Sequence, residues 1–129
     1  QARSFIFTTG SPPALAAATL EALRIAEVEP WRREAVRARS QRLRARLGEA
    51  GLDIPGPPDG HIVPVLVGDP VRTMAMVADL RRRGFLVGGV RPPTVPVGTS
   101  RLRISVSAVH PVEMVDALAA TIVAALRTS

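Results

Sequence analysis

The strongest constraint on the fold is the alternation of apolar and polar residues in RLRISVS (101–107). Leucine, isoleucine and valine alternate there with arginine and serine, a period of two that predicts a strand with one buried face. Arg103 is therefore expected on the face that points away from the core. The preceding segment, VRPPTVPVGTS (90–100), contains three prolines and one glycine. This composition predicts a stiff loop that leads into the strand.

Proline, glycine and capping residues divide the rest of the chain into further elements. Apolar spacing predicts helices over residues 14–28, 30–50, 70–83 and 111–127, and strands over residues 61–67 and 85–90. The order is helix, helix, strand, helix, strand, strand, helix. It indicates an α+β fold, with a small three-stranded antiparallel or mixed sheet, helices packed on one face, and linker helices before it.

Two elements carry more detailed predictions. The strand over 61–67 is almost entirely apolar, which favours a central position or cover on both faces. Pro64 within it favours an edge position or a bulge instead. The helix over 70–83 is expected to end at Gly84. Its predicted inner face consists of Val71, Met74, Ala75 and Ala78.

Composition excludes several kinds of site. The chain has no cysteine, which rules out disulfides and cysteine-based zinc sites. Its two histidines, His61 and His110, are too few for a histidine metal site, and no metal is expected. No long apolar run suggests a membrane span, and the first residues do not resemble a signal peptide. A cytoplasmic location is compatible with these features.

All 17 basic residues are arginine, and the formal net charge is +6. Many of them lie in the helix predicted over 30–50: Arg32, Arg33, Arg37, Arg39, Arg42, Arg44 and Arg46. A basic nucleic-acid-binding module is one alternative, because clustered arginines attract phosphate. The chain has only three phenylalanines and one tryptophan, however, which offers no platform for stacking single-stranded bases. A solvated helix face is the favoured interpretation.

The loop and the strand after it place arginines close together in the sequence. A guanidinium group presents a rigid fork of donors that matches the two oxygens of a carboxylate, so Arg91 and Arg103 suit the binding of a small acid. In the alternative interpretation, the prolines form a connector and the arginines decorate a solvated strand face. Arg101 is assigned a structural ion pair.

The motifs RPPTVP (91–96), GTSRLRI (98–104) and SAVH (107–110) resemble the carboxy-terminal signature of the α-oxoamine synthases. Those are pyridoxal-phosphate enzymes that condense an amino acid with an acyl thioester and release carbon dioxide. FIFTTGSPPA (5–14) resembles the segment that follows their large cofactor domain. The resemblance covers essentially the whole chain. It is closest to members that use L-alanine and a pimeloyl thioester, with glycine-dependent and sphinganine-type members as alternatives.

The resemblance implies roles for five residues. Arg103 would hold the carboxylate of the amino acid, Arg91 would engage it during the reaction, and Thr94 would contact the substrate. Thr8 and Thr9 would bind the phosphate of the cofactor in a neighbouring subunit. The complete enzyme would be a homodimer without membrane or nucleic-acid partners.

One essential group is missing from this chain. Pyridoxal-phosphate enzymes attach the cofactor to a lysine amine as a Schiff base, and the chain has no lysine. We therefore expect a carboxy-terminal fragment that has no catalytic residue, is inactive alone and binds no cofactor by itself. Its expected parts are a remnant of the large cofactor domain (1–10), linker helices (11–50) and a carboxy-terminal α+β domain (51–129).

Overall fold

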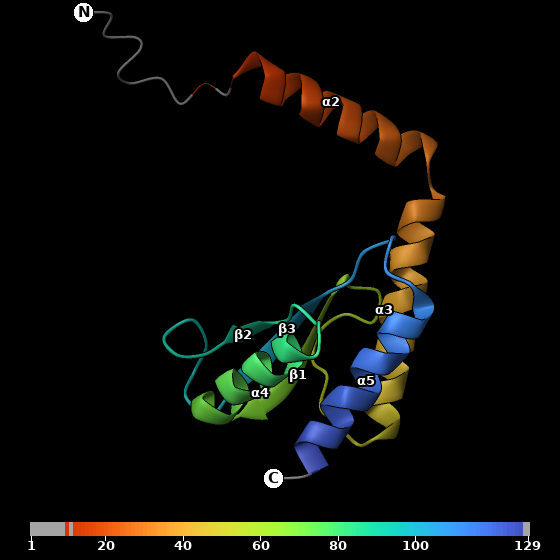
Figure 1. Ribbon diagram of the computed structural model, residues 1–129. Coiled ribbons are helices and arrows are strands. Elements are labelled where there is room, and N and C mark those ends of the chain that lie inside the picture. The colour runs from red at the N-terminus through yellow and green to blue at the C-terminus, as the bar shows by residue number, and fades with distance from the viewer. Residues whose placement is uncertain (1–9, 11, 128–129) are drawn as a thin grey trace, which may run out of the picture. The chain divides into compact units, whose positions relative to one another are not determined.

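The structure is a computed structural model that describes residue 10 and residues 12–127 (Figure 1). The chain divides into two compact units, one ending at Arg32 and the other beginning at Arg33. The β-prone segment at residues 5–8, together with Thr8 and Thr9, lies outside the described residues. Among the described helices, none combines the length and the apolar character needed to cross a membrane.

The first unit contains the helix α2 (Pro13–Val28). A proline occupies its first turn, where the missing N–H costs no hydrogen bond. No residue of α2 is buried, and Leu15, Leu20 and Leu23 are 56%, 70% and 60% exposed. Among the described residues of this unit, α2 thus presents apolar side chains to the surface.

Up to Arg127, where the described part of the chain ends, the second unit is built from three helices and three strands. They are α3 (Trp31–Glu49, whose first two residues belong to the first unit), β1 (Ile62–Gly68), α4 (Pro70–Arg82), β2 (Gly88–Val90), β3 (Ser100–Ser105) and α5 (Val112–Arg127). The strands form one antiparallel sheet in the order β1-β3-β2. The predicted α+β fold and the predicted order of elements are confirmed.

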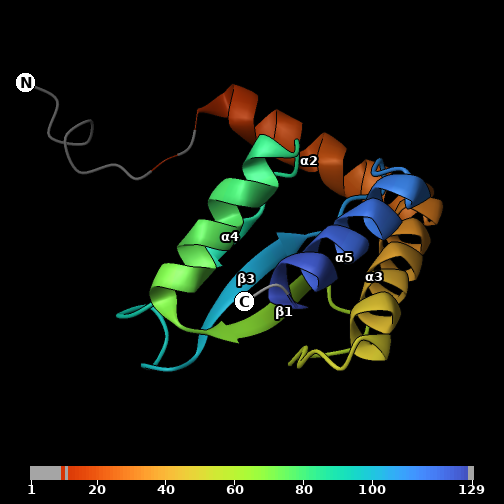
Figure 2. The ribbon, with the colours of Figure 1, turned by 60° about the horizontal axis from the view of Figure 1, so that its bottom comes forward.

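Helices cover one face of this sheet (Figure 2). α4 packs on all three strands, and the inward side chains of β1 and β3 are buried beneath the helices. The core residues come from every element of the unit except β2: Leu43, Leu47, Val63, Val65, Met76, Leu80, Val87, Leu102, Ile104, Val106, Val115, Leu118, Ala119 and Ile122. Complete burial of a leucine stabilises the fold by roughly 1.5–3 kcal/mol.

The predicted inner face of α4 is wrong. Val71, Met74, Ala75 and Ala78 are all exposed, whereas Thr73, Met76 and Leu80 are buried. Thr73 can be buried because its hydroxyl donates to the carbonyl of Asp69 at 2.7 Å, within the same helix. A pattern that counts only apolar residues misses a threonine whose hydrogen bond is satisfied locally.

Two strand predictions also need correction. β1 pairs only with β3 among the described strands, so it is an edge strand rather than a central one, as Pro64 indicated. The predicted strand over 85–90 shortens to Gly88–Val90, because the N–H of Phe85 donates to the carbonyl of Leu80 at 2.9 Å. Gly84, with a φ of +87°, provides the predicted end of the preceding helix.

Candidate functional site

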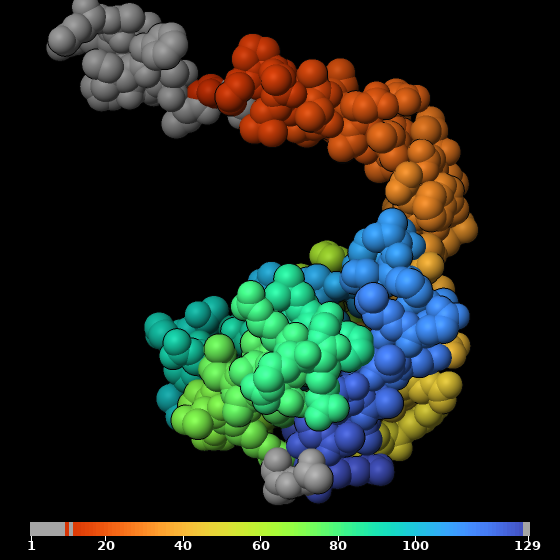
Figure 3. Space-filling model, viewed as in Figure 1, coloured from red at the N-terminus to blue at the C-terminus, as the bar shows by residue number. Residues whose placement is uncertain are grey.

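The loop between β2 and β3 is closed by two successive turns. The N–H of Thr94 donates to the carbonyl of Arg91 at 3.0 Å, which makes the first turn. In the second, the N–H and the hydroxyl of Thr99 both donate to the carbonyl of Pro96, at 3.2 and 2.7 Å. The Pro92–Pro93 peptide bond is cis. Figure 3 shows this part of the chain, coloured teal, at the surface of the second unit.

The register of the sheet separates the residues of β3 into two sets. Leu102 pairs with Val65 and Gly89 on the helix-covered face, where β3 is buried. Arg101 and Arg103 point to the opposite face, since successive side chains of a strand alternate. The predicted orientation of Arg103, away from the core, is confirmed.

Arg103 lies in the middle of this outer face, on the central strand. Its cross-strand neighbours are Pro64 on β1 and Gly88 on β2, neither of which carries a long side chain. A Cβ atom added to Gly88 would lie 3.8 Å from the Cβ of Arg103, so the glycine leaves the space beside this arginine open. Among the described residues, the guanidinium of Arg103 forms no hydrogen bond or ion pair. Arg103 therefore presents an exposed positive charge with no partner among the described residues.

Arg101, two residues earlier, has a different environment. It is half-buried between Leu66 and Val90, its neighbours on β1 and β2. Its Nε donates to the carbonyl of Thr99 at 2.9 Å. The predicted ion pair is therefore wrong for the part of the chain described: the partner is a backbone carbonyl and not a carboxylate.

Arg91 and Thr94 are both exposed, and one backbone turn brings them together. Arg91 is the first residue after β2, whereas Arg103 pairs with Gly88 at the start of that strand. Three residues of strand therefore separate the two arginines, roughly 10 Å at about 3.3 Å per residue. Like Arg103, the Arg91 side chain forms no hydrogen bond or ion pair within the described residues.

The two histidines lie in different environments. His61 is exposed, as expected. His110 accepts a hydrogen bond at Nδ1 from the N–H of Ser107 at 3.2 Å, just before α5. No group of three or more His, Cys, Asp or Glu side chains that could hold a metal ion occurs in the described ranges.

Several arginines of α3 tie this helix to the rest of the second unit, a role that the sequence did not reveal. Arg42 forms two hydrogen bonds with Asp116 of α5, Nε to Oδ1 at 2.7 Å and Nη2 to Oδ2 at 2.6 Å. Arg46 lies 3.6 Å from the same carboxylate. The hydrogen bond from Arg42 is the main reason why the pKa of Asp116 lies below its ordinary value.

Two further α3 arginines bind backbone carbonyls. Arg39 donates to the carbonyl of His110 at 2.6 Å, and Arg44 donates to the carbonyl of Ile62 at 3.1 Å. The guanidinium groups of these arginines are used in hydrogen bonds within the fold. They weaken the hypothesis of a nucleic-acid interface, which needs arginines free to contact phosphates.

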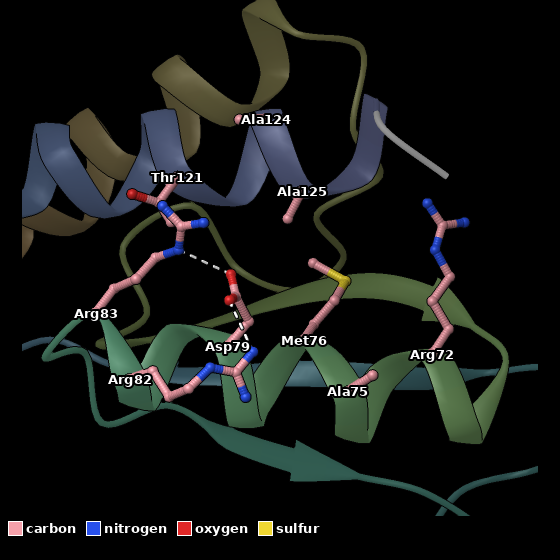
Figure 4. A pocket seen from close by; sticks show the side chains of 9 residues that line it. All are labelled: Arg72, Ala75, Met76, Asp79, Arg82, Arg83, Thr121, Ala124 and Ala125. Carbon is pink, nitrogen blue, oxygen red and sulfur yellow. Dashed lines mark hydrogen bonds and ion pairs between the residues drawn. The ribbon is translucent and has the colours of Figure 1, made fainter.

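A pocket of about 510 Å³ lies between α4 and α5 (Figure 4). Its lining residues are Arg72, Ala75, Met76, Asp79, Arg82, Arg83, Thr121, Ala124 and Ala125. Asp79 accepts hydrogen bonds from Arg83 at 2.8 Å and from Arg82 at 3.0 Å. The bond from Arg83 is the main cause that lowers the pKa of Asp79. None of the residues predicted to bind substrate lines this pocket.

The sequence has clear relatives. A model of the family described as aminotransferase class I and II matches residues 1–122. The 8-amino-7-oxononanoate synthase of Halorhodospira halophila is 50% identical over 128 residues, which are 98% of this chain and 32% of the relative. The enzyme of the same name from Methylobacterium radiotolerans is 50% identical over 124 residues, 96% of this chain and 32% of the relative. The chain thus spans about a third of the length of the curated relatives it matches.

Solved structures share the fold. A serine palmitoyltransferase from S. paucimobilis with bound PLP-myriocin aldimine gives a TM-score of 0.85 at 28% identity, over 95% of this chain and 31% of that chain. The 8-amino-7-oxononanoate synthase from Francisella tularensis gives a TM-score of 0.79 over 98% of this chain and 37% of that chain. At 18% identity, this second likeness is one of fold alone.

Proposed function

Because the chain belongs to the aminotransferase class I and II family, we propose that it is the carboxy-terminal part of an 8-amino-7-oxononanoate synthase of biotin biosynthesis. The complete enzyme would be a pyridoxal-phosphate-dependent acyltransferase that condenses L-alanine with a pimeloyl thioester and releases carbon dioxide. One observation carries the proposal: curated enzymes of this name are 46–50% identical over 94–98% of the chain.

In this proposal Arg103 binds the carboxylate of the amino acid. It is exposed on the central strand, beside a glycine and a proline, and has no partner among the described residues. A guanidinium group can donate two parallel hydrogen bonds to one carboxylate. Holding the carboxylate fixes the orientation of the α-carbon, and so decides which of its bonds is set to break.

Arg91 and Thr94 provide the second part of the substrate site. The turn that joins them is braced by prolines, so a cation and a hydroxyl are presented from one short segment. We propose that Arg91 engages the acid group during the reaction and that Thr94 contacts the substrate. The separation of roughly 10 Å along the sheet requires the long side chains of Arg91 and Arg103 to reach the substrate from two sides.

The residues of this chain do not suffice to hold the cofactor. Without a lysine, the chain cannot form the covalent link through which these enzymes attach pyridoxal phosphate. When bound, the cofactor supplies an electron sink. We propose that Thr8 and Thr9, which lie outside the described residues, bind its phosphate, and that the lysine belongs to a preceding large domain of which residues 1–10 are the end.

The proposal extends to the assembly and location of the complete protein. Residues 11–50 would form linker helices, the second of which (α3) also contributes Leu43 and Leu47 to the core, and residues 51–129 would form the carboxy-terminal domain. The exposed apolar face of α2, with Leu15, Leu20 and Leu23, suits a helix that other parts of a larger protein cover. The resemblance to the α-oxoamine synthases supports a cytoplasmic homodimer with an amino acid and an acyl thioester as substrates.

A sphinganine-type synthase is the second candidate, because a serine palmitoyltransferase shares the fold at 28% identity. That identity is lower than the 50% shared with the curated 8-amino-7-oxononanoate synthases. The two candidates differ in both substrates, so an assay of the complete protein separates them. We expect turnover with L-alanine and a pimeloyl thioester. Turnover only with L-serine and a palmitoyl thioester would overturn the proposal.

A further inference from the structure

Arg101 is the second residue of β3 and lies at the base of the loop (residues 91–99) that carries Arg91 and Thr94. It pairs with Val90 across the sheet, so it faces the last residue before Arg91. Its side chain turns back along its own strand, and its Nε donates to the carbonyl of Thr99, the last residue of the loop. Arg101 thus contacts both ends of the loop. It pairs with Val90 before the loop, and its guanidinium group binds Thr99 at the end of the loop.

The hydrogen bond of Arg101 continues into the loop. Thr99 donates from both its N–H and its hydroxyl to the carbonyl of Pro96, at 3.2 and 2.7 Å. The contacts therefore run from Arg101 through Thr99 to Pro96, two residues after Thr94. Each bond reduces the conformational freedom of a loop that is largely exposed.

The environment of Arg101 explains why it serves this purpose and Arg103 does not. Leu66 and Val90, on either side of Arg101, are half-buried apolar residues that confine its aliphatic stem. Arg103 lies between Pro64 and Gly88 and remains uncommitted among the described residues. Of the two arginines on this strand face, Arg101 binds the loop backbone, whereas the guanidinium group of Arg103 has no partner among the described residues.

We propose that Arg101 is a positioning residue: it holds the loop in the conformation in which Arg91 and Thr94 meet the carboxylate of the amino-acid substrate. The hold of Arg101 on the loop follows from the hydrogen bonds at Thr99. The contact of Arg91 and Thr94 with the substrate rests on the proposed function.

The test compares Arg101→Met and Arg101→Lys in the complete protein that carries this chain. Methionine keeps an unbranched apolar stem and removes every donor, whereas lysine keeps a cation and a donor. Arg81→Met is the matched control, because Arg81 is exposed on α4 and its side chain has no partner among the described residues. Hydrogen exchange is followed at the amides of Thr94 and Thr99, and at the amide of Phe85 as a reference for the intact fold.

Arg101→Met is expected to speed exchange at the Thr94 and Thr99 amides about fivefold to tenfold, the factor typical of losing one hydrogen bond. Exchange at Phe85 should stay unchanged, and Arg101→Lys should restore most of the protection. Unchanged exchange at both threonines in Arg101→Met would overturn the inference. This readout does not depend on which reaction the protein catalyses.

Kinetics test the link to the substrate. In Arg101→Met we expect the KM for L-alanine to rise by a similar factor, the KM for the pimeloyl thioester to stay the same, and Arg101→Lys to recover the wild-type KM in large part. An unchanged KM for alanine despite faster exchange would overturn the positioning role. If the wild-type protein does not use alanine and a pimeloyl thioester, the proposed function fails, and the exchange data still decide whether Arg101 holds the loop.

Discussion

The guanidinium group of Arg42 on α3 donates two hydrogen bonds, of 2.7 and 2.6 Å, to the carboxylate of Asp116 on α5. The two residues are 74 positions apart in the sequence, so the pair joins the first and the last helix of the second unit. Such bidentate pairs fix geometry as well as charge. The arginine-rich helix is thus bound to the fold by its charged side chains in addition to its buried leucines.

This pair predicts a pH-dependent contribution to stability. The pKa of Asp116 is lower in the folded protein than its ordinary value, so the folded state favours the ionised carboxylate. The contribution should be fully present above the ordinary pKa and lost as the pH falls through the lower, folded pKa. Urea unfolding should therefore show wild type more stable than Asp116→Asn at pH 7, with the difference shrinking toward about pH 2. A difference that is constant over this range would contradict the assignment.

The buried face of α4 can be tested with two alanine variants. Leu80 is fully buried, whereas Val71, which the sequence pattern placed inside, is 77% exposed. Leu80→Ala should lower the free energy of unfolding by about 2–5 kcal/mol. Val71→Ala should change it by less than about 0.5 kcal/mol. Chemical denaturation of both variants gives the comparison. A larger loss in Val71→Ala than in Leu80→Ala would mean that the helix packs through the opposite face.

Gly89 allows α4 to lie close to β2. A Cβ atom at this position would be 2.9 Å from the Sδ of Met74 and 3.0 Å from the Cγ2 of Val77. The exposed end of Met74 can move aside, but Val77 is branched at Cβ, so Gly89→Ala should cost about 1 kcal/mol of stability through overpacking. Gly88→Ala is the matched control, because its nearest contacts would be at 3.5 and 3.8 Å. Thermal unfolding in which Gly88→Ala is the more damaging substitution would reverse this account of the two glycines.

Much of the fold could be predicted from the sequence because local patterns determine it. The alternation in β3 identified its buried face, and Gly84 identified the end of α4. The misplaced face of α4 arose because Thr73 is buried with its hydroxyl bonded inside the helix. Phe85 was assigned to a strand although its N–H completes the turn after α4. These hydrogen bonds depend on the three-dimensional path of the backbone, which periodicity does not report.

The candidate site was predictable only in part for the same reason. Motif resemblance indicated Arg91, Thr94 and Arg103, and the structure shows Arg91 and Arg103 as exposed cations without partners among the described residues. The distinction between Arg103 and Arg101 depends on their cross-strand neighbours, which belong to strands distant in the sequence. Register therefore had to be known before the two arginines could be told apart.

The substrate role of Arg103 is tested most directly by the kcat/KM for L-alanine in the complete protein, measured for wild type, Arg103→Ala and the matched control Arg81→Ala. We predict that Arg103→Ala loses about 2–4 kcal/mol of transition-state stabilisation, a fall of about 30- to 1000-fold, because the carboxylate loses a charged hydrogen-bond donor. Arg81→Ala should remain close to wild type. A wild-type kcat/KM in Arg103→Ala would contradict the account and remove Arg103 from the site.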